Sequence, residues 1–130
     1  MAEPTTGIEA IDLHHRAQIG LVDALGELLA RGGDKALVDE TLARLLDFTE
    51  LHFRTEEALM ARHAYPGREA HAQAHGRLLE AARALARAVQ GGAAAGPRSA
   101  ADLRQWLHDH IRGADLDFGE WCRERGLEGT

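Results

Sequence analysis

The chain has 130 residues, of which 45% are hydrophobic and 28% are charged, and its formal net charge is -6. This length and balance predict one water-soluble domain spanning residues 1–130. The acidic charge argues against binding to a nucleic-acid backbone or to an anionic membrane. The single cysteine, Cys122, excludes a disulfide within the chain.

The first residues, MAEPTTGIEA, lack the basic and apolar regions of a secretion signal. No stretch approaches the roughly 20 consecutive apolar residues of a membrane-spanning helix. We therefore expect a cytoplasmic protein without membrane insertion, whose partner is a small molecule or another protein.

Turn-forming residues divide the sequence into four segments of similar length: GGD at 32–34, YPG at 65–67 and GGAAAGP at 91–97. Between these turns, apolar residues recur every three or four positions, which is typical of α-helices with one buried face. We expect helices at about 9–31, 36–63, 68–90 and 99–124. Because the connections are short, neighbouring helices should run antiparallel. The predicted fold is all-α, an up-down-up-down four-helix bundle.

The first predicted helix carries two adjacent histidines, His14 and His15, in DLHHRAQ. Apolar residues lie at helical steps from His15, which favours His15 as the inward-facing histidine. His14 is expected on the exposed side.

The second and third predicted helices each present a pair of polar residues four positions apart, His52 with Glu56 and His71 with His75. Residues at this spacing lie about 40° apart around a helix and about 6 Å apart along it, so each pair shares one face. Both faces continue the apolar stripe of their helix. Buried imidazoles and a buried carboxylate would cost several kcal/mol without partners, so a ligand should satisfy them. Glu57 is expected on a solvated edge.

The fourth predicted helix carries His110 and Asp115 in WLHDHIRGAD. Five residues of a regular α-helix would turn Asp115 about 140° away from His110. A local widening of the helix to the π type would return both side chains to one face, and Gly113 would ease it. We predict such a distortion between His110 and Asp115.

These candidates form a set of five imidazoles and two carboxylates: His15, His52, His71, His75, His110, Glu56 and Asp115. Seven ligands are too many for one tetrahedral zinc ion, and they suit two metal ions in the bundle core. If both carboxylates bridge two octahedral ions together with a solvent-derived oxygen, one coordination position stays open. Such a vacancy fits end-on binding of a diatomic molecule, although imidazole and carboxylate also suit manganese, cobalt and zinc.

The ligand order H, HxxxE, HxxxH and HxxxxD resembles the signature of the hemerythrins, and HFRTEEALM, YPGREAH and WLHDHI resemble their single-domain bacterial branch, the bacteriohemerythrins. The resemblance extends from about residue 8 to about residue 120. It implies two iron ions bridged by carboxylates and an oxo or hydroxo group, and reversible binding of dioxygen without enzymatic turnover. A member of this family is a standard example of the up-down bundle, so the resemblance implies the same architecture as the periodicity.

The resemblance also assigns roles to the ligands. It implies that the coordinatively saturated iron is held by His71, His75 and His110. It implies that the iron with the vacancy is held by His15 and His52, and that Glu56 and Asp115 bridge the two ions. Four residues match positions that line the oxygen pocket in the family: Phe53, Trp106, Leu107 and Ile111. The first three are expected in the core of any such bundle.

Gln18 lies three positions after His15, where relatives commonly have an apolar residue, so it departs from the family pattern. If Gln18 faces the oxygen pocket, its amide could hydrogen-bond the bound oxygen species or admit water. We hypothesise altered autoxidation or peroxide reactivity compared with a member that has a dry pocket.

Other functions compete with oxygen storage, delivery or scavenging. A di-iron peroxidase or oxidase would favour more carboxylate ligands, and the ExxH motifs of ferritin-like sites are missing. An oxygen or redox sensor would act through a partner protein, and delivery would require a protein acceptor or redox partner. Iron storage or repair is a weaker alternative, and a metal-free core or solvated face would require matching spacing on four helices by accident.

Overall fold

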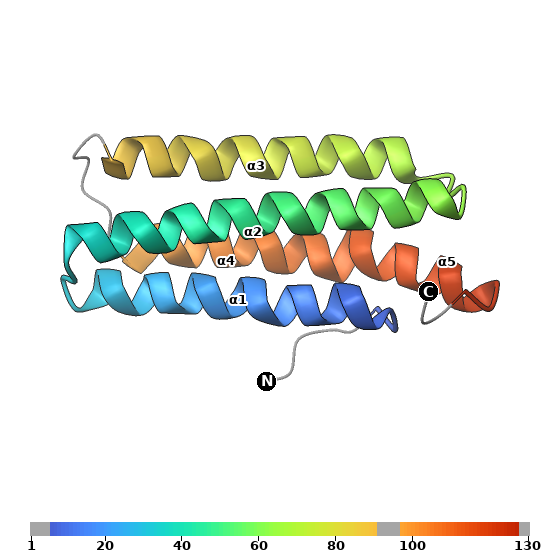
Figure 1. Cartoon of the computed structure of the whole chain (residues 1–130), viewed down its shortest axis with the longest axis horizontal. Coiled ribbons are helices and arrows are strands. Elements are labelled where there is room, and N and C mark those ends of the chain that lie inside the picture. Colours follow the sequence, from blue (N-terminus) through green and yellow to red (C-terminus); the bar gives the residue numbers. More distant parts are fainter. Residues whose placement is uncertain (1–5, 91–96, 128–130) are drawn as a thin grey trace.

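The computed structural model describes residues 6–90 and 97–127. These residues form helices and connecting turns: α1 (Glu9–Ala30), α2 (Lys35–Arg62), α3 (Arg68–Gln90), α4 (Pro97–His110), a π-helical segment η1 (Ile111–Asp115) and α5 (Leu116–Glu124). Helix α4 continues through η1 into α5, so the described chain forms four long helical rods that lie side by side (Figure 1). The predicted all-α four-helix bundle is confirmed.

Successive rods alternate in direction along the bundle, as the short connections require (Figure 1). Helix α1 packs against α2 and α4, and α3 packs against α2 and against α4. The helix ends lie within two residues of the predicted positions. The predicted turn at 91–97 lies outside the described residues except for Pro97, which begins α4. None of the described helices combines the length and low polarity needed to cross a membrane.

The bundle interior contains two apolar clusters separated by a polar layer. The larger cluster contains residues of all four rods, among them Ile19, Leu42, Ala86 and Leu103. The smaller cluster closes the other end of the bundle and contains Ile8, Ile11, Met60, Phe118 and Cys122. Buried polar residues occupy the layer between them: His15, Gln18, Thr49, His52, Glu56, His71, His75 and Asp115. Each of these residues is at most 5% exposed, so they are shielded from bulk water.

The π-helical segment lies where the sequence predicted a distortion, between His110 and Asp115. In a regular α-helix these residues would face different directions, and the wider π turn brings both toward the polar layer. A Cβ added at Gly113 would meet no atom within 4 Å, so this glycine makes no close packing contact. The predicted π distortion is therefore confirmed.

Gly119 allows α5 to approach the segment before α1. Its position leaves no space for a side chain, since an added Cβ would lie 2.9 Å from Thr6 Cα. The hydroxyl and backbone N–H of Thr6 both donate to the Asp12 carboxylate, which ties this segment to α1. We expect Gly119→Ala to lower the free energy of unfolding by about 1–3 kcal/mol.

Gly76→Ala is the matched control for this prediction, because an added Cβ in α3 would meet no atom within 4 Å. It should raise the free energy of unfolding by about 0.5–1 kcal/mol, since alanine favours a helix over glycine. Urea unfolding of the two variants measures both changes, and equal stability of the two variants would contradict the steric argument.

Candidate metal centre

All seven predicted ligands meet in the polar layer. Their ligand atoms form two groups, and within each group the atoms lie within 4.8 Å of one another. The first group contains Glu56, His71, His75, His110 and Asp115. The second contains His15, His52, Glu56 and Asp115. The two groups share both carboxylates, as a bridged pair of metal ions would require.

The Glu56 carboxylate directs one oxygen toward each group of histidines. Its Oε1 lies 2.6 Å from His71 Nε2 and 3.0 Å from His75 Nε2. Its Oε2 lies 3.5 Å from His52 Nε2. Glu56 therefore faces three histidines from two different helices through two different oxygens.

Asp115 is arranged in the same way from the opposite side of the centre. Its Oδ1 lies 2.8 Å from His71 Nε2 and 3.0 Å from His110 Nε2. Its Oδ2 lies 2.8 Å from His15 Nε2. Two adjacent ligands of an octahedral ion with bonds of about 2.1 Å lie about 3 Å apart. The contacts of both carboxylates thus match the separations of atoms that share an ion.

Unsatisfied polar atoms concentrate at this cluster. Within the described residues, six buried side-chain nitrogen or oxygen atoms lack a hydrogen bond. Five of these six belong to the cluster: His15 Nδ1, His52 Nε2, Glu56 Oε2, His110 Nε2 and Asp115 Oδ1. Buried polar groups normally have partners. Four of these five atoms, all except His15 Nδ1, face other ligands of the cluster, and such nitrogen and oxygen atoms fit divalent transition-metal ions.

The electrostatics of the metal-free cluster keep His52 and His75 available as ligands. Burial, with a further contribution from the neighbouring His15, lowers the pKa of His52 to about 3. Burial and the neighbouring His110 lower the pKa of His75 to about 2. Both imidazoles are therefore neutral near pH 7, and a neutral imidazole has a nitrogen lone pair that can bind metal.

The two carboxyl groups respond in opposite directions. Burial, followed by the charge of Asp115, raises the pKa of Glu56 well above its usual value. Burial alone would raise the pKa of Asp115, but contacts with His110, His15 and His71 hold it well below its usual value. Without metal the surroundings thus favour the protonated form of Glu56 and the ionised form of Asp115, whereas two cations would favour the ionised form of both.

Two residues outside the predicted ligand set contact the outer nitrogens of the ligands. Glu57 Oε2 lies 2.7 Å from His75 Nδ1, although the sequence placed Glu57 on a solvated edge. That expectation is wrong in part, because Glu57 is 36% exposed and also reaches the buried centre. His14 Nδ1 lies 3.0 Å from His52 Nδ1, and His14 is half-buried rather than exposed.

Each of these outer residues directly follows or precedes a ligand in the sequence and reaches across to a ligand on the adjacent helix. This adjacency is a signal that sequence reasoning could have used. Partners of this kind fix the orientation and tautomer of a metal-binding imidazole. Glu57 and His14 therefore hold His75 and His52 with Nε2 directed at the carboxylates.

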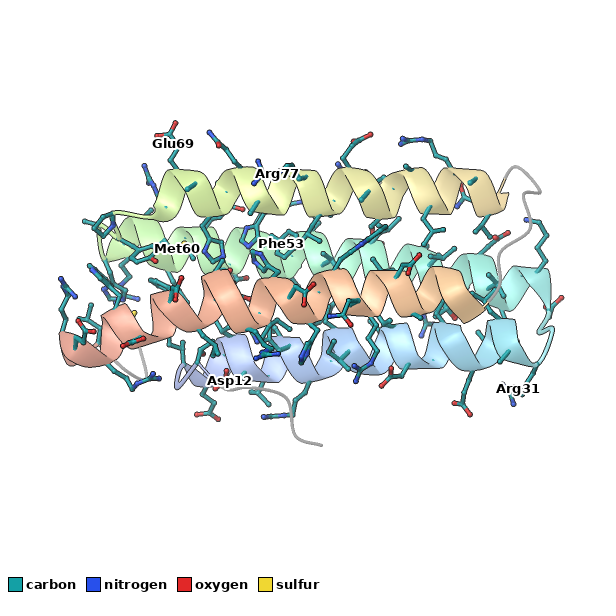
Figure 2. All side chains as sticks on the ribbon, turned by 180° about the vertical axis from the view of Figure 1, so that it is seen from behind. Asp12, Arg31, Phe53, Met60, Glu69 and Arg77 are labelled. Atoms are coloured by element: carbon teal, nitrogen blue, oxygen red, sulfur yellow. The ribbon has the colours of Figure 1, made fainter. Side chains whose placement is uncertain are left out.

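Glu57→Gln should weaken metal binding while leaving the number of bound ions at two. The amide keeps the size of the side chain but replaces the charged acceptor of His75, and losses of such partners typically cost about 10- to 100-fold in metal affinity. Competition with a chelator of known affinity measures the change. Glu69→Gln is the control, because Glu69 of α3 projects away from the bundle (Figure 2). Equal metal affinities for the two variants would exclude a role for Glu57.

Most of the predicted oxygen-pocket residues are buried beside this centre. Gln18, Phe53, Leu107 and Ile111 are each at most 3% exposed. Phe53 points into the space between the helices (Figure 2), and its ring stacks on His75 with centroids 3.7 Å apart. Their role in oxygen binding stays a prediction.

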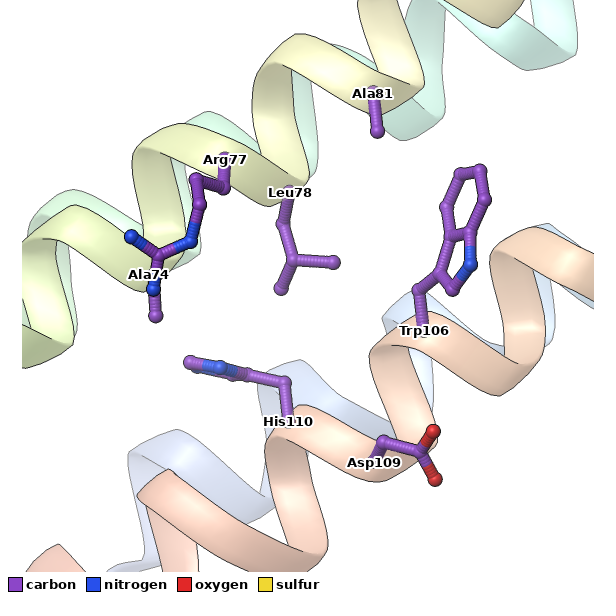
Figure 3. Close-up of a pocket in the computed structure, with 7 residues that line it drawn as sticks. All are labelled: Ala74, Arg77, Leu78, Ala81, Trp106, Asp109 and His110. Carbon is purple, nitrogen blue, oxygen red and sulfur yellow. The ribbon is translucent and has the colours of Figure 1, made fainter.

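The expected core position of Trp106 is wrong, because its side chain is 39% exposed. It lines an open groove of about 380 Å³ between α3 and α4, together with Ala74, Arg77, Leu78, Ala81, Asp109 and His110 (Figure 3). The buried stripe of α4 centres on Leu107 and has His110 at its edge. Trp106 lies about 100° from Leu107 and beyond that edge, so it faces solvent.

Comparisons with known proteins agree with this geometry. The family model described as hemerythrin HHE cation binding domain matches residues 6–122. The bacteriohemerythrin of Stenotrophomonas maltophilia is 30% identical over 114 residues, which cover 88% of this chain and 74% of that protein. The bacteriohemerythrin of Pseudomonas paraeruginosa is 29% identical over 118 residues, 91% of this chain and 76% of that protein. A crystal structure of wild-type hemerythrin superposes with a TM-score of 0.82 at 26% identity and covers 88% of both chains.

Proposed function

The chain belongs to the hemerythrin family, and from this premise we propose that it binds dioxygen reversibly at a non-haem centre of two iron ions. The physiological role would be storage, delivery or scavenging of oxygen. The observation that carries the proposal is the pair of ligand groups that share Glu56 and Asp115.

The two ligand groups are unequal, and this inequality supports binding of a small exogenous ligand. Three histidines accompany the shared carboxylates in one group, whereas His15 and His52 alone accompany them in the other. The second position therefore has one fewer protein ligand. A centre with one position left for an exogenous molecule suits a diatomic ligand.

Iron held by these seven residues would supply the electrons for reversible reduction of dioxygen. The side chains themselves hold, orient and shield. Glu57 and His14 fix the rings of His75 and His52 through their outer nitrogens. Leu107 and Ile111, at 3% and 1% exposure, close the layer against water, which would otherwise compete for the open position.

We propose ligand binding rather than enzymatic turnover because the ligand set is rich in nitrogen. Five imidazoles and two carboxylates place little negative charge on the metals. Oxidising enzymes that use high-valent iron would benefit from more anionic ligands. Turnover of hydrogen peroxide by the iron-loaded protein, at a rate well above that of free iron, would instead favour a peroxidase.

The proposal is tested by an optical spectrum of the reduced, iron-loaded protein under argon, after admission of air, and after renewed removal of oxygen. We expect two irons per chain and a visible charge-transfer band that appears with air and disappears under argon. A rapid and irreversible change to a ferric spectrum would contradict reversible binding and favour redox chemistry or sensing.

A further inference from the structure

Gln18 and Thr49 form a buried polar pair next to the metal centre. Gln18 is 1% exposed and Thr49 is 5% exposed. The amide Nε2 of Gln18 donates a hydrogen bond to Thr49 Oγ1, at 2.9 Å. Sequence reasoning singled out Gln18 as a departure from the family pattern but did not identify Thr49 as its partner.

The positions of the pair along the helices place it on one side of the two-histidine group. Gln18 follows His15 by three residues on α1, and Thr49 precedes His52 by three residues on α2. Because α1 and α2 are antiparallel, both steps lead about 4.5 Å in the same direction along the bundle. The hydrogen bond between Gln18 and Thr49 shows that their side chains meet there.

The bridging carboxylates lie on the other side of this group. Glu56 follows His52 by four residues, and Asp115 follows His110 on the parallel rod, so both are displaced away from Thr49. Leu107 precedes His110 by three residues and lies in the same layer as the polar pair. A ligand bound on the side of His15 and His52 that lies away from the carboxylates would therefore meet this layer of Gln18, Thr49 and Leu107.

The polar pair retains hydrogen-bonding capacity beyond its internal contact. A glutamine amide has two N–H donors, and the contact with Thr49 uses one of them. Ile19 follows Gln18 on α1, Leu45 precedes Thr49 by four residues on α2, and both belong to the apolar core, so this donor lies in poorly solvated surroundings. A hydrogen bond to an anion is strong in such surroundings.

We propose that Gln18, oriented by Thr49, donates a hydrogen bond to a small anion bound at the position held by His15 and His52. Gln18 and Thr49 thus determine ligand specificity, and they favour small anions that accept a hydrogen bond. This inference rests on the proposed function, because it requires metal ions on the seven ligands.

The test uses azide as the probe and the air-oxidised, iron-loaded chain of 130 residues. Optical titration gives the azide Kd for the wild type and for Gln18→Leu, Thr49→Val and the double variant. Gln18→Leu should weaken azide binding about 10- to 100-fold, because it removes a hydrogen bond to a charged ligand. Thr49→Val should weaken it less, and the double variant should resemble Gln18→Leu, because Thr49 acts through the amide.

Thr41→Val is the matched control on α2, because the Thr41 hydroxyl is exposed and donates to the Leu37 carbonyl. Its azide Kd should stay within about twofold of the wild type. The iron content of each iron-loaded variant reports on the site. Thermal unfolding of each metal-free variant reports on the fold.

An azide Kd within twofold of wild type, in Gln18→Leu or in the double variant with two irons bound, would overturn the inference. If Gln18→Leu fails to fold, the double variant still provides the test. It removes both polar groups of the pair, so neither is left buried without its hydrogen-bond partner. A wild-type chain that takes up no iron would instead contradict the proposed function, and the inference with it. Iron analysis distinguishes these two failures.

Discussion

Glu56→Gln is expected to leave the chain unable to hold two metal ions. Glu56 directs Oε1 toward His71 and His75 and Oε2 toward His52, so it serves both ligand groups. A glutamine amide is neutral and offers one oxygen, so it cannot bridge two cations. Loss of a charged partner from a buried site costs about 3–5 kcal/mol, or roughly 100- to 5,000-fold in affinity for the second ion.

The metal-free form of this variant should fold as well as the wild type. Burial and the charge of Asp115 raise the pKa of Glu56, which favours its neutral form without metal, and glutamine mimics that form. Metal analysis after gel filtration, with thermal unfolding of the metal-free protein, measures both effects. Glu57→Gln is the control and should keep two ions. Retention of two tightly bound ions by Glu56→Gln would rule out a bridging role for this carboxylate.

Removal of the metal should lower the midpoint of thermal unfolding by roughly 25 °C. An ion present at 1,000 times its Kd stabilises the fold by about 4 kcal/mol, so two sites contribute about 8 kcal/mol. For a chain of this size each kcal/mol corresponds to roughly 3 °C. Thermal unfolding before and after chelation measures the difference. A difference of only a few degrees would mean that the polar layer is stable without ions.

The metal-free chain should also lose stability as the pH falls from about 6.5. In the folded chain the pKa of His52 is about 3 and that of His75 is about 2, whereas both are near 6.5 in the unfolded chain. Between about pH 3 and pH 6.5 these two histidines bind more protons in the unfolded chain than in the folded chain, so acid favours unfolding. Above about pH 4.5 Glu56 has the opposite effect on stability, because its raised pKa lets the folded chain keep a proton that the unfolded chain has lost.

Between pH 4.5 and 6.5, His52 and His75 together give a slope of at most two protons, roughly 2.7 kcal/mol per pH unit, and Glu56 reduces it. Urea unfolding of the chelated protein at several pH values measures it. His52→Gln should flatten the dependence, since it removes one of the two titrating imidazoles. A stability that does not change over this interval would show that the histidines are not buried as neutral groups.

The sequence by itself determined the helices and the main ligand faces. Periodicity and turn residues suffice for helices because hydrogen bonds and the apolar stripe are set within each segment. The pairs His52 with Glu56 and His71 with His75 share a face for the same reason. The five-residue interval between His110 and Asp115 also predicted the π-helical segment, because any other local geometry would separate the two side chains.

The tertiary structure alone decided what each side chain meets on the neighbouring helices. The contacts of Glu57 with His75, His14 with His52, and Gln18 with Thr49 each join two helices. These contacts depend on the relative rotation and axial position of packed helices, which local spacing does not contain. The exposure of Trp106 has the same origin, because the rotation of α4 decides which side of its stripe meets α3. Local periodicity thus specified the ligands, whereas helix packing specified their outer partners and the polar wall beside them.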